Sequence, residues 1–169
     1  MAGNRARPPR VADERTLLVG WLNQQRALIP WKCEGLGDAD ARRSVVAPSP
    51  LMTMAGLVAH LRWVEHCWFE VVFLNRPPGG NPQFAADAVA EDWRVRDVPL
   101  ATLVAEYEAQ CAISDEIVAA HSLDDVATHP EYGGESLRWI LLHMLEETAR
   151  HAGHADIVRE LLDGTKGYY

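Results

Sequence analysis

The amino-acid sequence predicts an all-α protein, a four-helix bundle with a long crossover between its second and third helices. In four long stretches, apolar residues recur at spacings of three and four, which is the period of one helix face. Segments containing proline and glycine separate these stretches, and such segments are where helices end. No stretch shows a convincing alternation of apolar and polar residues, so nothing in the sequence favours a half-buried strand.

The first predicted helix begins after Asp13, which is a suitable N-cap, and closes at Gly35 and Gly37. The second runs from about residue 51 to Leu74 and is strongly apolar. Its N-cap is either Ser49, which is followed by proline, or Thr53. The run RPPGGNPQ at residues 76–83 must end this helix, because it holds two prolines in succession and two glycines.

The stretch 76–98 has no clear period and is longer than most connections. We expect it to cross over between two parallel helices and to form part of a pocket rim, with Trp93 as an aromatic lid. The third helix opens at Pro99, and the fourth is capped by Ser136 and ends at Gly164. Gly153 interrupts the fourth helix, which suggests that another group approaches it closely.

The chain of 169 residues is long enough for one domain, expected at residues 13–164 with tails at 1–12 and 165–169. A net charge of −8 argues against a nucleic-acid partner. No window is apolar enough for a membrane span and no secretory signal is recognisable, so a cytoplasmic location is expected. Three cysteines without a CxxC spacing exclude a disulfide framework and a thiolate zinc finger.

The predicted fourth helix carries a cluster of metal-binding residue types. Glu147 and His151 are one turn apart, so both side chains can reach one ion. A facing helix need supply only one more ligand, and His60, in the middle of the apolar second helix, is the obvious candidate. Two histidines and a carboxylate with an open fourth position suit catalytic zinc and resemble the facial triad of non-haem iron. A hydrogen-bonded core histidine and a surface Glu–His pair are the alternative reading.

Two further histidines share this helix face. His154 is the one candidate catalytic residue, as a proton shuttle or as a group supporting a ligand, and the alternative is a surface partner for Asp156 or Glu160. His143 is one turn before Glu147, where it can hydrogen-bond that carboxylate or simply pack in the core.

The runs LRWILLHMLEETARHAGHADIVRELLDG and GLVAHLRWVEHCWFE resemble the DinB-like superfamily, and more closely its branch related to mycothiol-dependent maleylpyruvate isomerase. The resemblance extends from about Glu14 to Gly164. It implies a four-helix bundle of DinB type that holds a divalent metal through His60, Glu147 and His151. Most members of the superfamily have histidine where this chain has Glu147, so the resemblance leaves the identity of the metal open, with zinc first and nickel or iron next.

The resemblance also implies a transferase or isomerase that uses a low-molecular-weight thiol of the mycothiol type and a small-molecule electrophile. A metal at an open site favours the thiolate, which is the nucleophilic form. A metal-dependent hydrolase and a non-catalytic bundle that binds a metal or ligand are the competing hypotheses. Homodimerisation is a further expectation from the relatives.

Several other side chains are candidates for the site. Trp63 and Trp68 flank the His60 face, so either could line a pocket, although aromatic bulk in a bundle is usually core. Arg138 could bind a substrate carboxylate or lie in solvent. Cys67 is two turns beyond His60 and is expected in the core.

Overall fold

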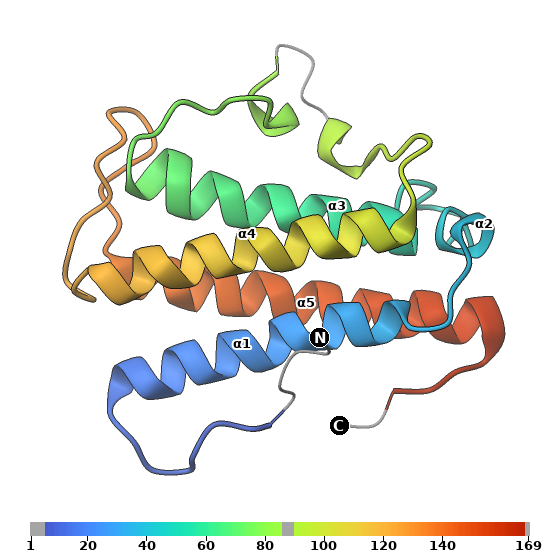
Figure 1. The fold of residues 1–169 in the computed structure, drawn as a ribbon, viewed down its shortest axis with the longest axis horizontal. Coiled ribbons are helices and arrows are strands. Elements are labelled where there is room, and N and C mark those ends of the chain that lie inside the picture. Colours follow the sequence, from blue (N-terminus) through green and yellow to red (C-terminus); the bar gives the residue numbers. More distant parts are fainter. Residues whose placement is uncertain (1–5, 86–89, 168–169) are drawn as a thin grey trace.

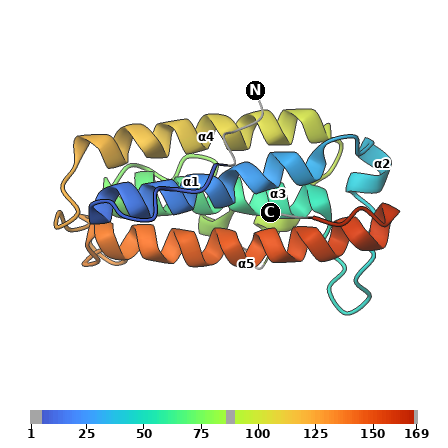
Figure 2. The same cartoon turned by 90° about the horizontal axis from the view of Figure 1, so that it is seen from below.

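Four long helical stretches run side by side in the computed structural model, which describes residues 6–85 and 90–167 (Figure 1, Figure 2). Helix α1 packs on α5 and α3 on α4, and α3 also contacts α5. Within the described ranges the structure has no strand, and an isolated bridge joins Val126 to Ser136. The predicted all-α class is therefore confirmed. The stretches are α1 (Glu14–Cys33), α3 (Met54–Glu65) with its π-helical continuation η1 (His66–Phe73), α4 (Leu100–Ala120) and α5 (Leu137–Asp163).

Local capping fixes the start of α1 and both ends of α5 where the sequence predicts them. The Asp13 carboxylate accepts the backbone N–H of Thr16 at 3.0 Å, and the Ser136 hydroxyl accepts that of Trp139 at 3.3 Å. Gly164 follows α5 in the left-handed conformation, with φ of 77°. These contacts satisfy backbone groups that a helix end leaves without partners inside the helix.

Helix α3 begins later than residue 51. The Thr53 hydroxyl accepts the backbone N–H of Gly56 at 3.0 Å, so Thr53 is the N-cap. The alternative cap, Ser49, is wrong because residues 49–52 form a turn instead, in which Met52 N–H donates to the Ser49 carbonyl at 3.0 Å.

The second half of this helix differs from the predicted α-helix. From His66 to Phe73 it is π-helical, with a wider turn than the α-helix that precedes it. Cys67 is half-buried and packs against the hydrophobic cluster that contains Phe69 and Met144. The expectation that Cys67 lies in the core is therefore met only in part.

The crossover between α3 and α4 passes over α3, and the colours in Figure 1 show that these two helices run in the same direction. It contains two short 3₁₀ helices, η2 (Pro82–Phe84) and η3 (Glu91–Trp93). A Cβ atom on Gly56 would lie 3.0 Å from the Trp93 carbonyl oxygen. Glycine at this position therefore lets the η3 backbone lie directly on α3, one turn before His60.

Two features were not expected from the sequence. A short helix α2 (Asp38–Ala41) follows α1, and the Asp38 carboxylate accepts the backbone N–H of Leu100 at 2.8 Å. The side chain that caps α4 thus comes from a distant part of the chain.

At Gly153 the expectation of a close approach is wrong, because no atom lies within 4 Å of a Cβ added there.

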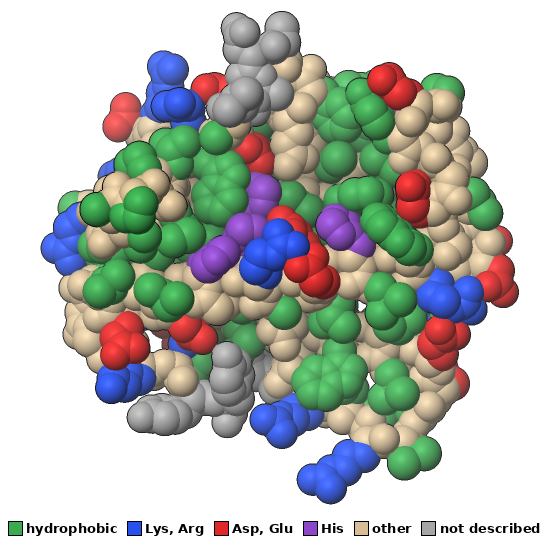
Figure 3. Space-filling model, turned by 180° about the vertical axis from the view of Figure 1, so that it is seen from behind, with side chains coloured by type: hydrophobic (Ala, Val, Ile, Leu, Met, Phe, Trp, Pro, Cys, Tyr) green, Lys and Arg blue, Asp and Glu red, His purple; other side chains and the backbone are tan. Residues whose placement is uncertain are grey.

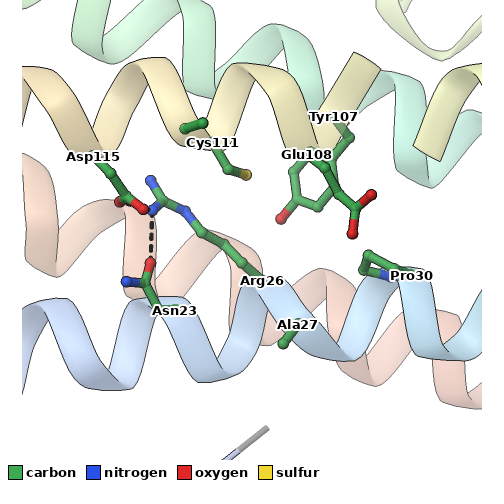
Figure 4. A pocket seen from close by; sticks show the side chains of 9 residues that line it. Asn23, Arg26, Ala27, Pro30, Tyr107, Glu108, Cys111 and Asp115 are labelled. Atoms are coloured by element: carbon green, nitrogen blue, oxygen red, sulfur yellow. Dashed lines mark hydrogen bonds and ion pairs between the residues drawn. The ribbon is translucent and has the colours of Figure 1, made fainter. Parts of the chain in front are cut away.

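A buried ion pair joins three of the long helices. Arg26 of α1 is 5% exposed and donates through Nε and Nη2 to both carboxylate oxygens of Glu65, each at 2.7 Å. Its Nη1 donates to Asp115 of α4 at 2.6 Å and to Asn23 at 2.8 Å. Figure 4 shows this side chain extending from α1 towards α4 beside a cavity of about 320 Å³. All three nitrogen atoms of the Arg26 guanidinium group therefore donate hydrogen bonds within the protein.

Replacing Arg26 by alanine is expected to lower the free energy of unfolding by about 3–5 kcal/mol, because Glu65 would keep a buried carboxylate without its cation. Arg43→Ala is the matched control, since Arg43 and Asp40 form an exposed pair whose loss costs below about 1 kcal/mol. Urea unfolding followed by circular dichroism measures both. Equal, small effects would mean that the pair does not join the helices energetically.

Candidate metal centre

Three predicted ligands meet between α3 and α5. His60 comes from the middle of α3, and Glu147 and His151 are one turn apart on α5. One ligand atom of each residue lies within 4.8 Å of the other two, and all three side chains are buried. The Glu147 Oε1 atom is 3.2 Å from His60 Nε2 and 3.1 Å from His151 Nε2. Two imidazole nitrogens thus converge on one carboxylate oxygen.

Asp92 of η3 fixes the orientation of His60. Its Oδ2 atom is 2.6 Å from His60 Nδ1 and also accepts a hydrogen bond from Gln83 Nε2 at 2.9 Å. An acid at Nδ1 holds the ring proton there and leaves Nε2 directed towards Glu147. The sequence analysis did not single out Asp92. The only signal was its position in a crossover expected at the pocket rim, and sequence cannot show which residue of such a segment returns to α3.

The converging atoms require a positive charge between them. A neutral His60 that donates its Nδ1 proton to Asp92 has a lone pair at Nε2, and this lone pair faces the Glu147 carboxylate. A proton is one solution: burial lowers the pKa of His60, but the contacts with Asp92 and Glu147 outweigh burial and raise it. A divalent cation is the other, because two imidazoles and a carboxylate are its usual ligands. The donor set therefore fits a metal ion.

The carboxylate of Glu147 is held in its ionised form. Hydrogen bonds with His151 and His60 keep the pKa of Glu147 far below its ordinary value, against the effect of burial. Its second oxygen, Oε2, lies 3.0 Å from Nη1 of Arg150 at the protein surface. Arg150 also pairs with Glu146, as the i, i+4 spacing predicts. One oxygen of Glu147 is therefore neutralised from outside and the other faces the histidines.

Trp93 covers the two imidazoles. Its ring stacks on that of His60, with centroids 4.2 Å apart and planes 20° apart, and meets the edge of His151 at 5.2 Å. Ala90, just before η3, has a left-handed φ of 59°, which is unusual for a residue other than glycine. Stacking by Trp93 and the hydrogen bond that Asp92 accepts from His60 together hold the His60 ring against the crossover.

His154 lies next to the candidate ligands and is not one of the three converging residues. Its Nδ1 is 3.2 Å from Nδ1 of His151. Burial lowers the pKa of His154, as do the charges of His151 and Arg150. Figure 3 shows histidine side chains gathered on this face, with a hydrophobic area and a group of charged side chains next to them. His154 and His151 also line a cavity of about 400 Å³.

The other candidate residues make their contacts outside this group of three. His143 packs against the rings of Trp68 and Trp139, at 4.6 Å and 5.3 Å, which favours the packing alternative over a hydrogen bond to Glu147. Arg138 is held by Glu14 at 2.8 Å and by a second carboxylate, and does not face the cavity beside His151. Trp63 stacks under the guanidinium of Arg62.

The cysteines of the chain are poor nucleophiles. Burial raises the pKa of Cys33 and of Cys67 to about 12, and raises that of Cys111 as well. The thiolate is the reactive form of a cysteine. A reaction at sulfur in this protein would therefore need a thiol from outside the chain.

A buried group of two histidines and a glutamate between two helices defines a candidate divalent-metal site in an all-α protein. The chain belongs to the mycothiol-S-transferase family, whose model matches residues 17–164. This family is DinB-like, which confirms the resemblance stated from the sequence. Among curated proteins and among solved structures, none matches the chain. None of the helices described is both long and apolar enough to cross a membrane.

Iodoacetamide at pH 8 is expected to alkylate the cysteines of the folded protein far more slowly than those of the unfolded chain. With a pKa of about 12, roughly one thiol in ten thousand is ionised at this pH. The rate should rise about tenfold per pH unit, because the thiolate fraction does. Mass spectrometry after timed quenching measures the rate of alkylation at each cysteine. A cysteine that reacts equally fast in both states would contradict the assigned burial of its thiol.

Proposed function

We propose that this protein is a metal-dependent S-transferase that joins a low-molecular-weight thiol of the mycothiol type to an electrophilic carbon. The observation that carries the proposal is the convergence of His60, Glu147 and His151 in a chain of the mycothiol-S-transferase family. The high pKa values of the chain's own thiols support an external thiol as the nucleophile.

We also propose that the fold is a four-helix bundle of DinB type formed by one domain at residues 13–164. The protein is further proposed to act in the cytoplasm, where thiols are kept reduced.

His60, Glu147 and His151 would hold the ion, with zinc as the first expectation and nickel or iron as alternatives. A divalent cation bound there supplies positive charge that lowers the pKa of a thiol and favours its thiolate. Asp92 keeps the Nδ1 proton of His60 in place, and Glu147 stays ionised, so both ligands keep the right protonation state. Trp93 excludes water from one side of the imidazoles.

His154 has a positioning role in this proposal. When His151 uses Nε2 as a ligand, its proton is on Nδ1, and His154 Nδ1 is the acceptor 3.2 Å away. The lowered pKa of His154 keeps its ring neutral and able to accept that hydrogen bond. His154 thus supports His151 in the way that Asp92 supports His60.

The test measures metal content and thiol transfer together. The purified protein is expected to hold one equivalent of a divalent metal and to join mycothiol to an activated aryl halide, with release of halide and a proton. His151→Ala and Glu147→Ala should lose both properties. His143→Ala is the matched control on the same helix and should keep both, because His143 packs on tryptophans outside the site.

The other outcomes separate the competing functions. Metal-dependent turnover of esters, amides or lactones without thiol transfer would indicate a hydrolase. Metal that stabilises the fold without any turnover would indicate a binding protein. A parent protein without metal, even after reconstitution at neutral pH, would overturn the proposed mechanism.

Asp92→Asn is expected to lower metal affinity about 10- to 100-fold, because the amide no longer fixes the His60 proton as a carboxylate does. Competition with a metal-binding dye measures the affinity. Glu91→Gln is the neighbouring control, since Glu91 pairs with Arg94 rather than with His60. Unchanged affinity in Asp92→Asn would show that the crossover does not support the metal site.

A further inference from the structure

Beside the candidate metal centre lies a cavity of about 400 Å³. His151 and His154 form one wall, and the remaining walls are almost wholly apolar. A dry apolar cavity of about 150 Å³ is enough to hold benzene, so this one can take a larger apolar group. Apart from the two histidines, the lining residues are Ser49, Pro50, Leu51, Met52, Ala90 and Trp93.

A second cavity, of about 300 Å³, adjoins the first along Pro50, Leu51 and Trp93, which line both. Its remaining wall carries three arginines, Arg42, Arg94 and Arg96, in a chain whose net charge is −8. This wall of the cavity is therefore positively charged, although the net charge of the protein is negative.

Two of the three guanidinium groups have no carboxylate partner among the described residues. Arg94 is paired with Glu91 at 2.7 Å. Arg42 donates to the backbone carbonyl of Val98 at 3.0 Å, and neither Arg42 nor Arg96 forms an ion pair within residues 6–85 and 90–167. A planar guanidinium binds a carboxylate through two parallel hydrogen bonds, which makes a carboxylate the fitting ligand.

We propose that the electrophile of this site has an apolar body with a carboxylate at its far end. The body lies in the first cavity, between Met52 and Trp93 and beside His151, and the carboxylate reaches Arg42 and Arg96 in the second. This proposal rests on the proposed S-transferase function and names its substrate class. The two cavities separate the reacting carbon from the charged end, so one end of the substrate is held while the other faces the metal centre.

The reaction on such a substrate forms one bond from sulfur to carbon and breaks one bond from that carbon to its leaving group. The leaving group departs with the electron pair of the broken bond, and the thiol proton is released to solvent. No oxidant or reductant is required. The arginines take no part in the bond changes; they hold the carboxylate and thereby orient the reacting carbon.

Binding is tested with an unreactive pair, 3-phenylpropanoate and its neutral amide, by calorimetry on the protein as purified. The acid is expected to bind at least about tenfold more tightly than the amide. In the double variant Arg42→Gln, Arg96→Gln this preference should vanish while the affinity for the amide is unchanged. Arg43→Gln is the matched control, because Arg43 neighbours Arg42 but does not line the cavity. Met52→Gln should weaken both ligands.

Equal binding of acid and amide would overturn the proposal. So would an acid preference that survives the double variant, since the carboxylate would then be bound by groups other than Arg42 and Arg96. The outcome is separable from the proposed function. Thiol transfer to neutral electrophiles with no arginine-dependent acid preference overturns only the substrate class. Arginine-dependent acid binding without any thiol transfer overturns the S-transferase function and leaves an acid-binding site.

Discussion

The burial of His60, Glu147, His151 and Asp92 in one contact group is the constraint on which the rest of the structure depends. Charged and polar groups taken out of water are costly unless they satisfy each other. His60 and Glu147 can meet only if α3 and α5 keep one axial position relative to each other. Asp92 can reach His60 only if the crossover returns over α3, and the absence of a side chain at Gly56 allows that approach.

The protein uses buried charge in two contrasting ways. Around Arg26, the donors of one guanidinium are matched by Glu65, Asp115 and Asn23, so the network is closed and holds the helices together. Between His60 and Glu147, a ring nitrogen and a carboxylate oxygen face each other, and this contact needs a proton or a metal cation between them. The first arrangement contributes to stability, and the second is suited to binding an ion.

The short helix η3 links the parts of the site that have different chemical tasks. Asp92 orients His60, and the next residue, Trp93, stacks on the same imidazole and forms a wall of both cavities. A shift of this segment would change the support of His60 and the shape of the proposed substrate site together. The proposed metal site and the proposed substrate site therefore share this one segment of the crossover.

The sequence by itself determined the helical class, the caps at Asp13, Ser136 and Gly164, and the pairing of Glu147 with His151, because periodicity, capping and i, i+4 contacts act within a turn or two. Tertiary structure decided the rest. It brought Asp92 to His60 and Asp38 to the start of α4, changed the second half of the α3 stretch to a π-helix, and set the arginines beside Trp93. These contacts join residues far apart in the chain, and only the packing of the helices fixes which of them meet.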